Sequence, residues 1–247
     1  GILIPVLILG GLALALGLLI ALISKLFSIK ADKLQEEVMA ALPQANCGAC
    51  GFTGCEGYAK WLASGGKDTG KCPVGGPSLA VTLGTLLGVE AKAAEPPVAH
   101  VMCKGTHDNT SKRYEYTGTK TCASAHAVFS GPNSCTYGCI GFGDCVEACQ
   151  FDAIDIRDGI AVINEFKCKS CEKCVPACPK KLIFMIPKGH QTYKVECRNH
   201  WPGGETRKHC KVGCIACQRC VKVCPTQAIH MDENLAVIDP AKCNNCG

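Results

Sequence analysis

The chain has 247 residues, 22 of them cysteine, with an aromatic content of 6% and a formal net charge of +5. So many thiols and so few aromatic rings argue against one large apolar core, because small cysteine-rich domains are usually held together by disulfides or metal centres. The net charge counts every cysteine as neutral, so metal-bound thiolates would offset it, and we do not interpret it as a sign of nucleic-acid binding.

The spacing of the cysteines decides between disulfides and metal centres. Disulfide frameworks scatter cysteines among loops, whereas this chain has them in short runs, several of which end in Cys-Pro. Such runs are typical of iron–sulfur cluster loops. We therefore expect a protein that binds clusters and whose soluble part lies in a reducing compartment.

Residues 1–25 predict a transmembrane helix. The first 24 residues contain no charged side chain, and a helix of that length reaches roughly 36 Å, enough to cross a bilayer. A cleaved signal peptide is the alternative, but no basic region precedes the apolar run and no small-residue cleavage site follows it. Lysines at 25, 30 and 33 follow the span, so we expect a single-pass anchor in the plasma or inner membrane with the cysteines on the cytoplasmic side.

Residues 31–90 predict a small four-iron four-sulfur domain. Helical spacing predicts one short helix that ends at Pro43 and another over Glu56–Ser64. Glycines around the cysteines would let backbone amides approach the cluster. The expected ligands are Cys47, Cys50, Cys55 and Cys72. A structural zinc site is the alternative, although zinc motifs usually come as two separate Cys-x-x-Cys knuckles.

A 75-residue repeat fills the rest of the chain. Seven cysteines recur at this offset: Cys122 and Cys197, Cys135 and Cys210, Cys139 and Cys214, Cys145 and Cys220, Cys149 and Cys224, Cys168 and Cys243, Cys171 and Cys246. Flanking residues agree, as in the Gly-Cys-Ile that occurs at 138 and at 213. We expect a linker over 91–121, a two-cluster ferredoxin-like module over 122–196, and a second such module over 197–247.

The first copy contains the bacterial ferredoxin run, whose fourth cysteine binds the other cluster of a pair. This exchange rule assigns one cluster to Cys135, Cys139, Cys145 and Cys178. It assigns the other cluster to Cys149, Cys168, Cys171 and Cys174. Two alternating runs, 153–156 and 160–164, predict a β-hairpin between the two cysteine runs.

In the second copy, two runs of cysteines are possible. The standard run is Cys214, Cys217, Cys220 and Cys224, and we prefer it to the run in which Cys210 replaces Cys217. With Cys243 and Cys246, each cluster of this copy lacks one ligand, so we expect the native chain to continue. We expect at least three [4Fe–4S] clusters, and five once the C-terminus is complete. Cys103, Cys122 and Cys197 are interpreted as buried apolar thiols, and a ligand role for them stays open.

The sequence therefore predicts small α+β iron–sulfur modules behind one N-terminal transmembrane helix, namely a glycine-loop four-iron domain and bacterial two-cluster ferredoxin-like repeats. The order of these segments resembles the B subunit of the Rnf electron transport complex, in its clostridial or acetogen type with extra ferredoxin modules. The stretch Gly-Cys-Ile-Gly-Phe-Gly-Asp-Cys at 138–145 is the most specific element of the resemblance. The small domain is also similar to one in a corrinoid iron–sulfur protein.

The resemblance implies that reduced soluble ferredoxin delivers electrons to this chain. Other subunits of the membrane complex would then reduce NAD and translocate Na⁺ or H⁺. One uncharged membrane helix offers no site for ion transport. Neither a Rossmann fingerprint, a Walker loop nor a nucleophilic triad is visible, so we expect no catalytic residue and electron transfer alone.

Basic side chains gather around the second copy, at Arg198, Arg207, Lys208, Lys211, Arg219 and Lys222. A docking face for an acidic ferredoxin is one interpretation, and a solvated surface is the other. Three other functions stay open: the cluster subunit of another membrane hydrogenase or dehydrogenase, a corrinoid-pathway iron–sulfur protein, and an interaction protein stabilised by zinc.

Overall fold

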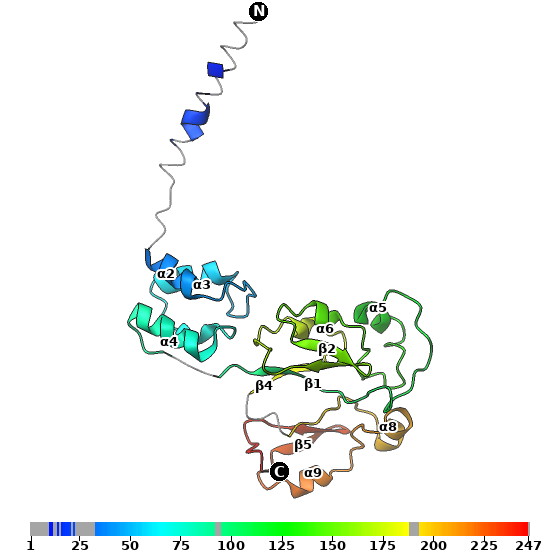
Figure 1. Cartoon of the computed structure of the whole chain (residues 1–247). Helices are drawn as coiled ribbons and strands as arrows, with labels where there is room; N and C mark the ends of the chain where they lie inside the picture. Colours follow the sequence, from blue (N-terminus) through cyan, green and yellow to red (C-terminus); the bar gives the residue numbers. More distant parts are fainter. Residues whose placement is uncertain are drawn as a thin grey trace, which may run out of the picture.

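The computed structural model describes residues 33–91, 95–187 and 193–246, together with positions 10, 11, 14, 16–20 and 22. Figure 1 shows a helical N-terminal cluster domain, a first module that contains β1 to β4, and a second module that contains β5 and β6. The predicted transmembrane helix over 1–25 falls largely outside the described residues, and its described positions are helical. Within the described part of the chain, no helix has the length and hydropathy needed to cross a membrane.

The N-terminal cluster domain consists of α2 (Lys33–Ala41), α3 (Cys55–Ala63), the 3₁₀ helix η1 (Thr69–Lys71) and α4 (Gly76–Leu87). Helix α3 lies within one residue of the predicted 56–64 at each end, and α2 ends two residues before Pro43, which confirms both predicted helices. The apolar faces of α2, α3 and α4 meet around Val38, Tyr58 and Leu83, each 1% exposed or less. We did not predict α4, because Gly75-Gly76-Pro77 is typical of a turn. Proline in the first turn of a helix removes no internal hydrogen bond.

The first module contains β1 (Val98–Val101), α5 (Cys122–Ala127), α6 (Asp144–Glu147), β2 (Ile154–Arg157), β3 (Ile160–Ile163), α7 (Cys174–Ala177) and β4 (Ile183–Ile186). Strands β2 and β3 pair antiparallel, which confirms the predicted hairpin. Asp158 and Gly159 at its turn have φ values of 48° and 83°. Two positive φ angles define the tight turn whose twist matches that of paired strands.

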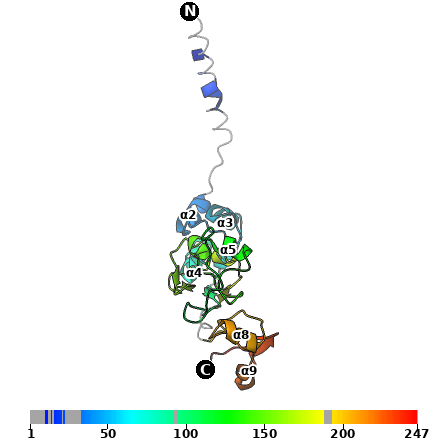
Figure 2. The ribbon, with the colours of Figure 1, turned by 90° about the vertical axis from the view of Figure 1, so that its right-hand side faces the viewer.

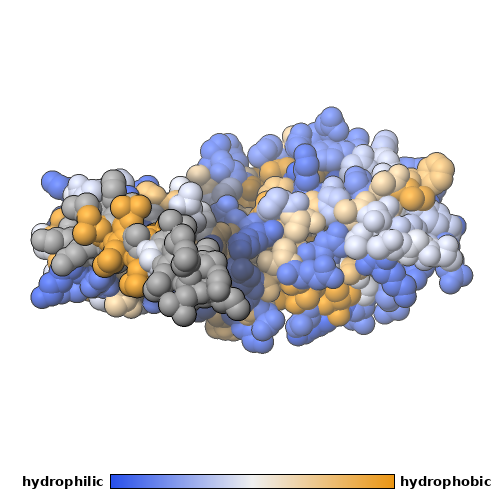
Figure 3. Space-filling model, turned by 90° about the horizontal axis from the view of Figure 1, so that it is seen from above, coloured by the Kyte–Doolittle hydropathy of each residue, from blue (hydrophilic) through white to orange (hydrophobic). Residues whose placement is uncertain are grey.

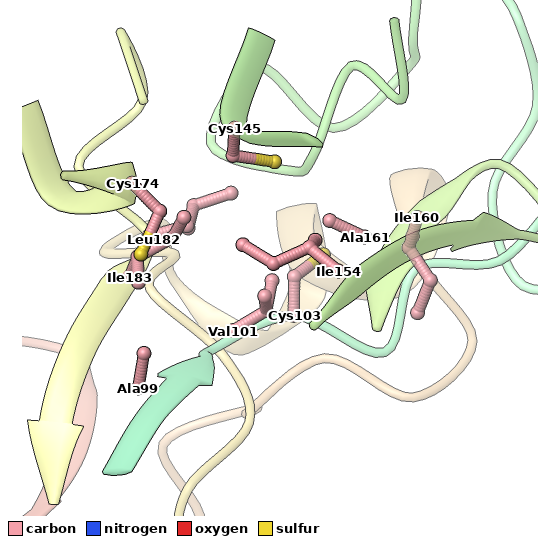
Figure 4. Packing of buried hydrophobic residues seen from close by; sticks show 10 residues of the cluster. All are labelled: Ala99, Val101, Cys103, Cys145, Ile154, Ile160, Ala161, Cys174, Leu182 and Ile183. Carbon is pink, nitrogen blue, oxygen red and sulfur yellow. The ribbon is translucent and has the colours of Figure 1, made fainter. Parts of the chain in front are cut away.

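Strand β1 lies within 91–121, the segment that we expected to be a linker. It pairs antiparallel with β4, so that Val98 is opposite Ile186 and Val101 is opposite Ile183. Figure 4 shows Cys103, Cys145 and Cys174 among the aliphatic side chains of the core that these strands share with the hairpin. A four-residue strand shows too little alternation to be found from sequence, and only burial against a distant partner fixes it.

The second module contains α8 (Gly203–His209), α9 (Arg219–Val223), β5 (Ile229–Asp232) and β6 (Leu235–Ile238). Its antiparallel hairpin lies 75 residues after that of the first module, strand for strand, as the repeat predicts. Figure 2 shows this module at the side of the first module that is away from the N-terminal cluster domain. In the view from above, hydrophilic residues (blue) lie between separate groups of hydrophobic residues (orange) on the part of the face that grey atoms do not cover (Figure 3).

Candidate iron–sulfur cluster sites

The four predicted ligands of the N-terminal cluster domain line one cavity, and we call Cys47, Cys50, Cys55 and Cys72 the N-terminal set. Asn46 closes the loop that carries them, because its side-chain oxygen accepts a hydrogen bond from the Cys55 N–H at 2.9 Å. Gly54 has a φ of 150°, and a Cβ there would lie 2.9 Å from that oxygen. The loop therefore requires glycine for conformation and for space.

Burial is the main cause that raises the pKa of Cys72, and the charges of Cys50 and Cys47 raise it further. Thiolates so close together repel one another, which favours their protonated forms. A positive iron centre between them would displace the protons and relieve this repulsion. Phe52 and Tyr58 lie 5.4 Å and 6.2 Å, respectively, from the Trp61 ring. Trp61 thus belongs to the aromatic packing behind the cavity.

A second cavity is lined by the cysteines that the exchange rule groups around the hairpin, and we call Cys149, Cys168, Cys171 and Cys174 the hairpin set. Ile154 and Ile163 of the hairpin form its apolar wall. Burial, with the charges of the other three thiols, raises the pKa of Cys174 to about 12. The backbone N–H of Ala153 donates to the Cys149 sulfur at 3.4 Å, which is the kind of bond that tunes a cluster thiolate.

The other predicted ligand group of the first module is brought together only in part. Its members are Cys135, Cys139, Cys145 and Cys178. Burial, followed by the charges of Cys122, Cys178 and Cys174, raises the pKa of Cys145 to about 12. The Leu182 N–H donates to the Cys178 sulfur at 3.5 Å. Cys122, which we interpreted as an apolar thiol, therefore lies with two predicted ligands.

Cys135 and Cys139, the two remaining members of that predicted group, line a third cavity with Cys103, Cys197 and Cys210. Burial is the main cause that raises the pKa of Cys139. Burial raises the pKa of Cys135 to about 11, with further contributions from the charges of Cys103, Cys210 and Cys197. Sequence reasoning missed this grouping. One signal in the sequence could have indicated a ligand role for Cys103. It precedes the predicted ligand Cys178 by 75 residues, which is the offset of the repeat.

The second module repeats the hairpin cavity. Cys220, Cys224, Cys243 and Cys246 line it, and the last three correspond to Cys149, Cys168 and Cys171 of the first copy. The Thr226 hydroxyl beside Cys224 lowers the pKa of that thiol. Cys214 lies beside Cys197, whose pKa is raised by burial and by the Cys214 charge, and Cys217 is exposed.

Neighbouring cavities are close enough for their thiols to interact. Among the causes that raise the pKa of Cys171, burial comes first and the charge of Cys47, in the N-terminal set, is another. Besides burial, the charge of Cys174, in the hairpin set, likewise raises the pKa of Cys145, and that of Cys145 raises the pKa of Cys139 in the third cavity. Thiols of neighbouring sites thus interact from the N-terminal cluster domain through the first module to the third cavity, which the second module lines in part.

All-thiolate sites suit iron–sulfur clusters or zinc. In the described part of the chain, no three His, Cys, Asp or Glu side chains are placed to hold a single metal ion. A [4Fe–4S] cubane does not require its ligands to converge on one point, because each thiolate binds a different iron atom of a larger core. The four-cysteine cavities and the N–H···S bonds fit such a core. The fold and these sites define a multi-cluster iron–sulfur protein built from ferredoxin-type modules.

Comparison with known proteins supports this class. A family model for an Fe-S cluster matches residues 42–74, a 4Fe-4S dicluster domain matches 134–182, and a 4Fe-4S binding domain matches 213–230.

Three relatives align with almost the whole chain, and each is the B subunit of an oxidoreductase complex. That of the Na⁺-translocating ferredoxin:NAD⁺ oxidoreductase complex of Acetobacterium woodii is 42% identical over 99% of this chain and 74% of its own length. That of the ion-translocating oxidoreductase complex of Methanosarcina acetivorans is 39% identical over 97% and 91%. That of the proton-translocating ferredoxin:NAD⁺ oxidoreductase complex of Clostridium ljungdahlii is 38% identical over 95% and 83%. The chain belongs to this family, the B subunits of Rnf complexes, which confirms the resemblance.

Proposed function

We propose that this chain is the iron–sulfur electron-transfer subunit of a membrane complex. It accepts electrons from reduced ferredoxin and passes them toward NAD reduction, which is coupled to translocation of Na⁺ or H⁺. The observation that carries the proposal is the series of cysteine cavities in a chain whose relatives bear these activities in their names. Bound [4Fe–4S] clusters supply one-electron transfer, and the protein holds and insulates them.

The membrane location rests on the N-terminal segment. Its described large apolar side chains are all 55% exposed or more: Leu14, Leu16, Leu18, Leu19, Ile20 and Leu22. Apolar helical side chains without protein cover fit a lipid environment. With the lysines that follow, they support a single-pass anchor whose cluster domains face the cytoplasm.

The coupling ion belongs to other subunits in this proposal. One relative is named for Na⁺ and another for protons, although both are about 40% identical to this chain. No charged residue lies within the first 24 positions, so this segment offers no ion ligand of its own. The same architecture can therefore serve either ion.

Iron and acid-labile sulfide analysis, combined with low-temperature EPR and stopped-flow kinetics, tests the proposal. The anaerobically purified chain should contain about four iron and four sulfide per cluster and show interacting signals after dithionite reduction. Reduced ferredoxin should reduce these clusters rapidly. Zinc without sulfide would contradict any electron-transfer role, whereas clusters that ferredoxin fails to reduce would favour a different membrane hydrogenase or dehydrogenase.

A further inference from the structure

Four cysteines from separate parts of the chain meet where the first module contacts the second. Cys103, Cys135, Cys197 and Cys210 line the same cavity, and we call them the interface set. Cys139 lines this cavity too, but it also interacts with Cys145 of the first module, to whose cluster we assign it below. Three members of the interface set are 9% exposed or less, and Cys197 is partly buried. No run of closely spaced cysteines contains this set, so only the fold brings its members together.

Cys103 has the hydrogen bonds of a ligand. The backbone N–H groups of Gly105 and Cys139 each donate to its sulfur at 3.4 Å. Cys149 and Cys178, which the exchange rule predicts as ligands, each accept one such bond at 3.4 Å and 3.5 Å. A thiol that packs as a small hydrophobic side chain needs no such donors, whereas a cluster thiolate is stabilised by them.

The walls of this cavity are fixed by bonds between the modules. The Thr110 hydroxyl donates to the His209 carbonyl oxygen, and the Lys211 N–H donates to that of Asn109, both at 2.9 Å. Ser134 and His209 form a side-chain hydrogen bond of 2.6 Å. The Tyr137 ring meets that of Trp201 edge to face at 5.4 Å. A set of thiols held on both sides by such contacts is preorganised for a bound group.

Comparison of the two copies explains why Cys197 and Cys210 are not needed as ligands by the second copy's own clusters. The standard ferredoxin run of the second copy includes Cys217, and the first copy has Phe142 at the corresponding position. The second copy can therefore build its cluster without Cys197 and Cys210. The first copy needs another ligand in place of the cysteine that Phe142 replaces. Cys122 lies beside Cys145, and the Cys122 N–H donates to the Asp144 side chain at 2.6 Å.

We propose that the interface set binds a further [4Fe–4S] cluster between the two modules. The first module then binds its own second cluster through Cys122, Cys139, Cys145 and Cys178. Assembly forms four Fe–S bonds at the interface set and releases one proton from each thiol. Lys104, Glu196 and Arg198 also line the cavity. Lys104 forms a 3.6 Å ion pair with Glu196, so Arg198 is the cation that offsets part of the negative charge that remains.

This cluster completes the electron path through the protein. Cys139 of the first module donates its N–H to Cys103, and Cys214 of the second module lies beside Cys197. One electron enters the oxidised core and leaves to the next cluster, without exchange of ligands or protons. The assignment rests on the cavity and its bonds, so it holds or fails apart from the identity of the physiological partner.

Iron content of serine variants tests the proposal. Cys103→Ser, Cys197→Ser and Cys210→Ser should each lose about four iron per chain or show a changed EPR signal, because serine is a poor iron ligand of nearly the same size. A variant with all four substitutions should also lose about four, because all four thiols hold one cluster. Cys122→Ser, the matched control from another cluster, combined with Cys210→Ser should lose about eight.

Iron content and EPR signals equal to those of the unmodified chain in the Cys103→Ser and Cys197→Ser variants would overturn the proposal. So would one zinc ion in place of the lost iron. A variant that loses all its iron has unfolded and does not report on a single site. In that case, thiol labelling of the unmodified chain during stepwise iron removal tests whether the interface set holds one cluster. The four thiols of the interface set should become reactive as one group. Labelling at separate stages, or before iron is removed, would refute the site.

Discussion

Gly141 lies where a cysteine loop of the first module meets the hairpin turn. Its φ is 83°, and a Cβ at this position would overlap the carbonyl group of Gly159. We expect Gly141→Ala to lower the free energy of unfolding by about 2 kcal/mol or more, because the side chain adds strain and a clash. Anaerobic denaturation followed by cluster absorbance measures this. Gly204→Ala is the control, because a Cβ there has no neighbour within 4 Å, and equal midpoints for both variants would contradict the clash.

His100 is a buried titratable residue on β1. Burial, followed by the positive charge of Lys194, lowers its pKa below the ordinary 6.5, although Glu165 at 3.1 Å opposes this. The folded state then binds fewer protons than the unfolded state, so His100 contributes stability above pH 6.5 that is lost as pH falls through the folded pKa.

We expect the free energy of unfolding to fall more between pH 7 and pH 5 in the unmodified chain than in His100→Gln. Glutamine keeps a polar side chain of similar size but does not titrate in this range. Denaturation curves at the two pH values measure the difference, which cancels any acid lability common to both proteins. Identical pH slopes would show that His100 stays uncharged or is equally charged in both states.

At the scale of elements, helix α4 closes the N-terminal cluster domain shortly after Cys72, one of its predicted ligands. Leu83 on its inner face is 0% exposed, whereas Val81 on its outer face is 53% exposed. Leu83→Ala should destabilise this domain by about 2–5 kcal/mol, because it leaves a cavity in the core. Val81→Ala should cost less than about 1 kcal/mol. Thermal loss of the N-terminal cluster signal measures both, and similar effects would mean that α4 does not support the cluster.

At the scale of the whole molecule, the basic side chains of the second module are divided between α8 and α9, with Arg207 and Lys208 on α8 and Arg219 and Lys222 on α9. Lys208 on α8 and Lys211 shortly after it are both exposed, and Lys208 forms a 2.8 Å ion pair with Glu205. Charge reversal at both lysines should slow reduction by an acidic ferredoxin by about tenfold at low salt and weaken its salt dependence, because encounter is steered electrostatically.

Stopped-flow reduction at several ionic strengths measures the effect of this charge reversal. Lys60→Glu with Lys67→Glu is the matched control, because both lysines lie on the N-terminal cluster domain, away from α8. Iron content must equal that of the unmodified chain in both variants, since Lys211 adjoins a ligand of the proposed interface cluster. A rate and a salt response that stay unchanged would favour an ordinary solvated surface.

The sequence by itself determined the local parts of this protein. Closely spaced cysteines predicted three members of the N-terminal set and three of the hairpin set, a Cys-Pro supplied Cys72 and the exchange rule supplied Cys149, and each set lines one cavity. The 75-residue offset predicted two copies of one hairpin, which the structure contains strand for strand. These features depend on neighbours within a loop or a turn, and their spacing is written directly in the chain.

Only the tertiary structure decided how distant segments meet. Pairing of β1 with β4 brings Cys103 into the first module, and contacts between the modules bring Cys197 and Cys210 to Cys135. The exchange rule placed Cys135 elsewhere, because spacing alone cannot tell which thiol of a loosely spaced run faces which cavity. That choice depends on the packing of whole segments, whose contacts are set by burial and shape and leave no periodic signal in the sequence.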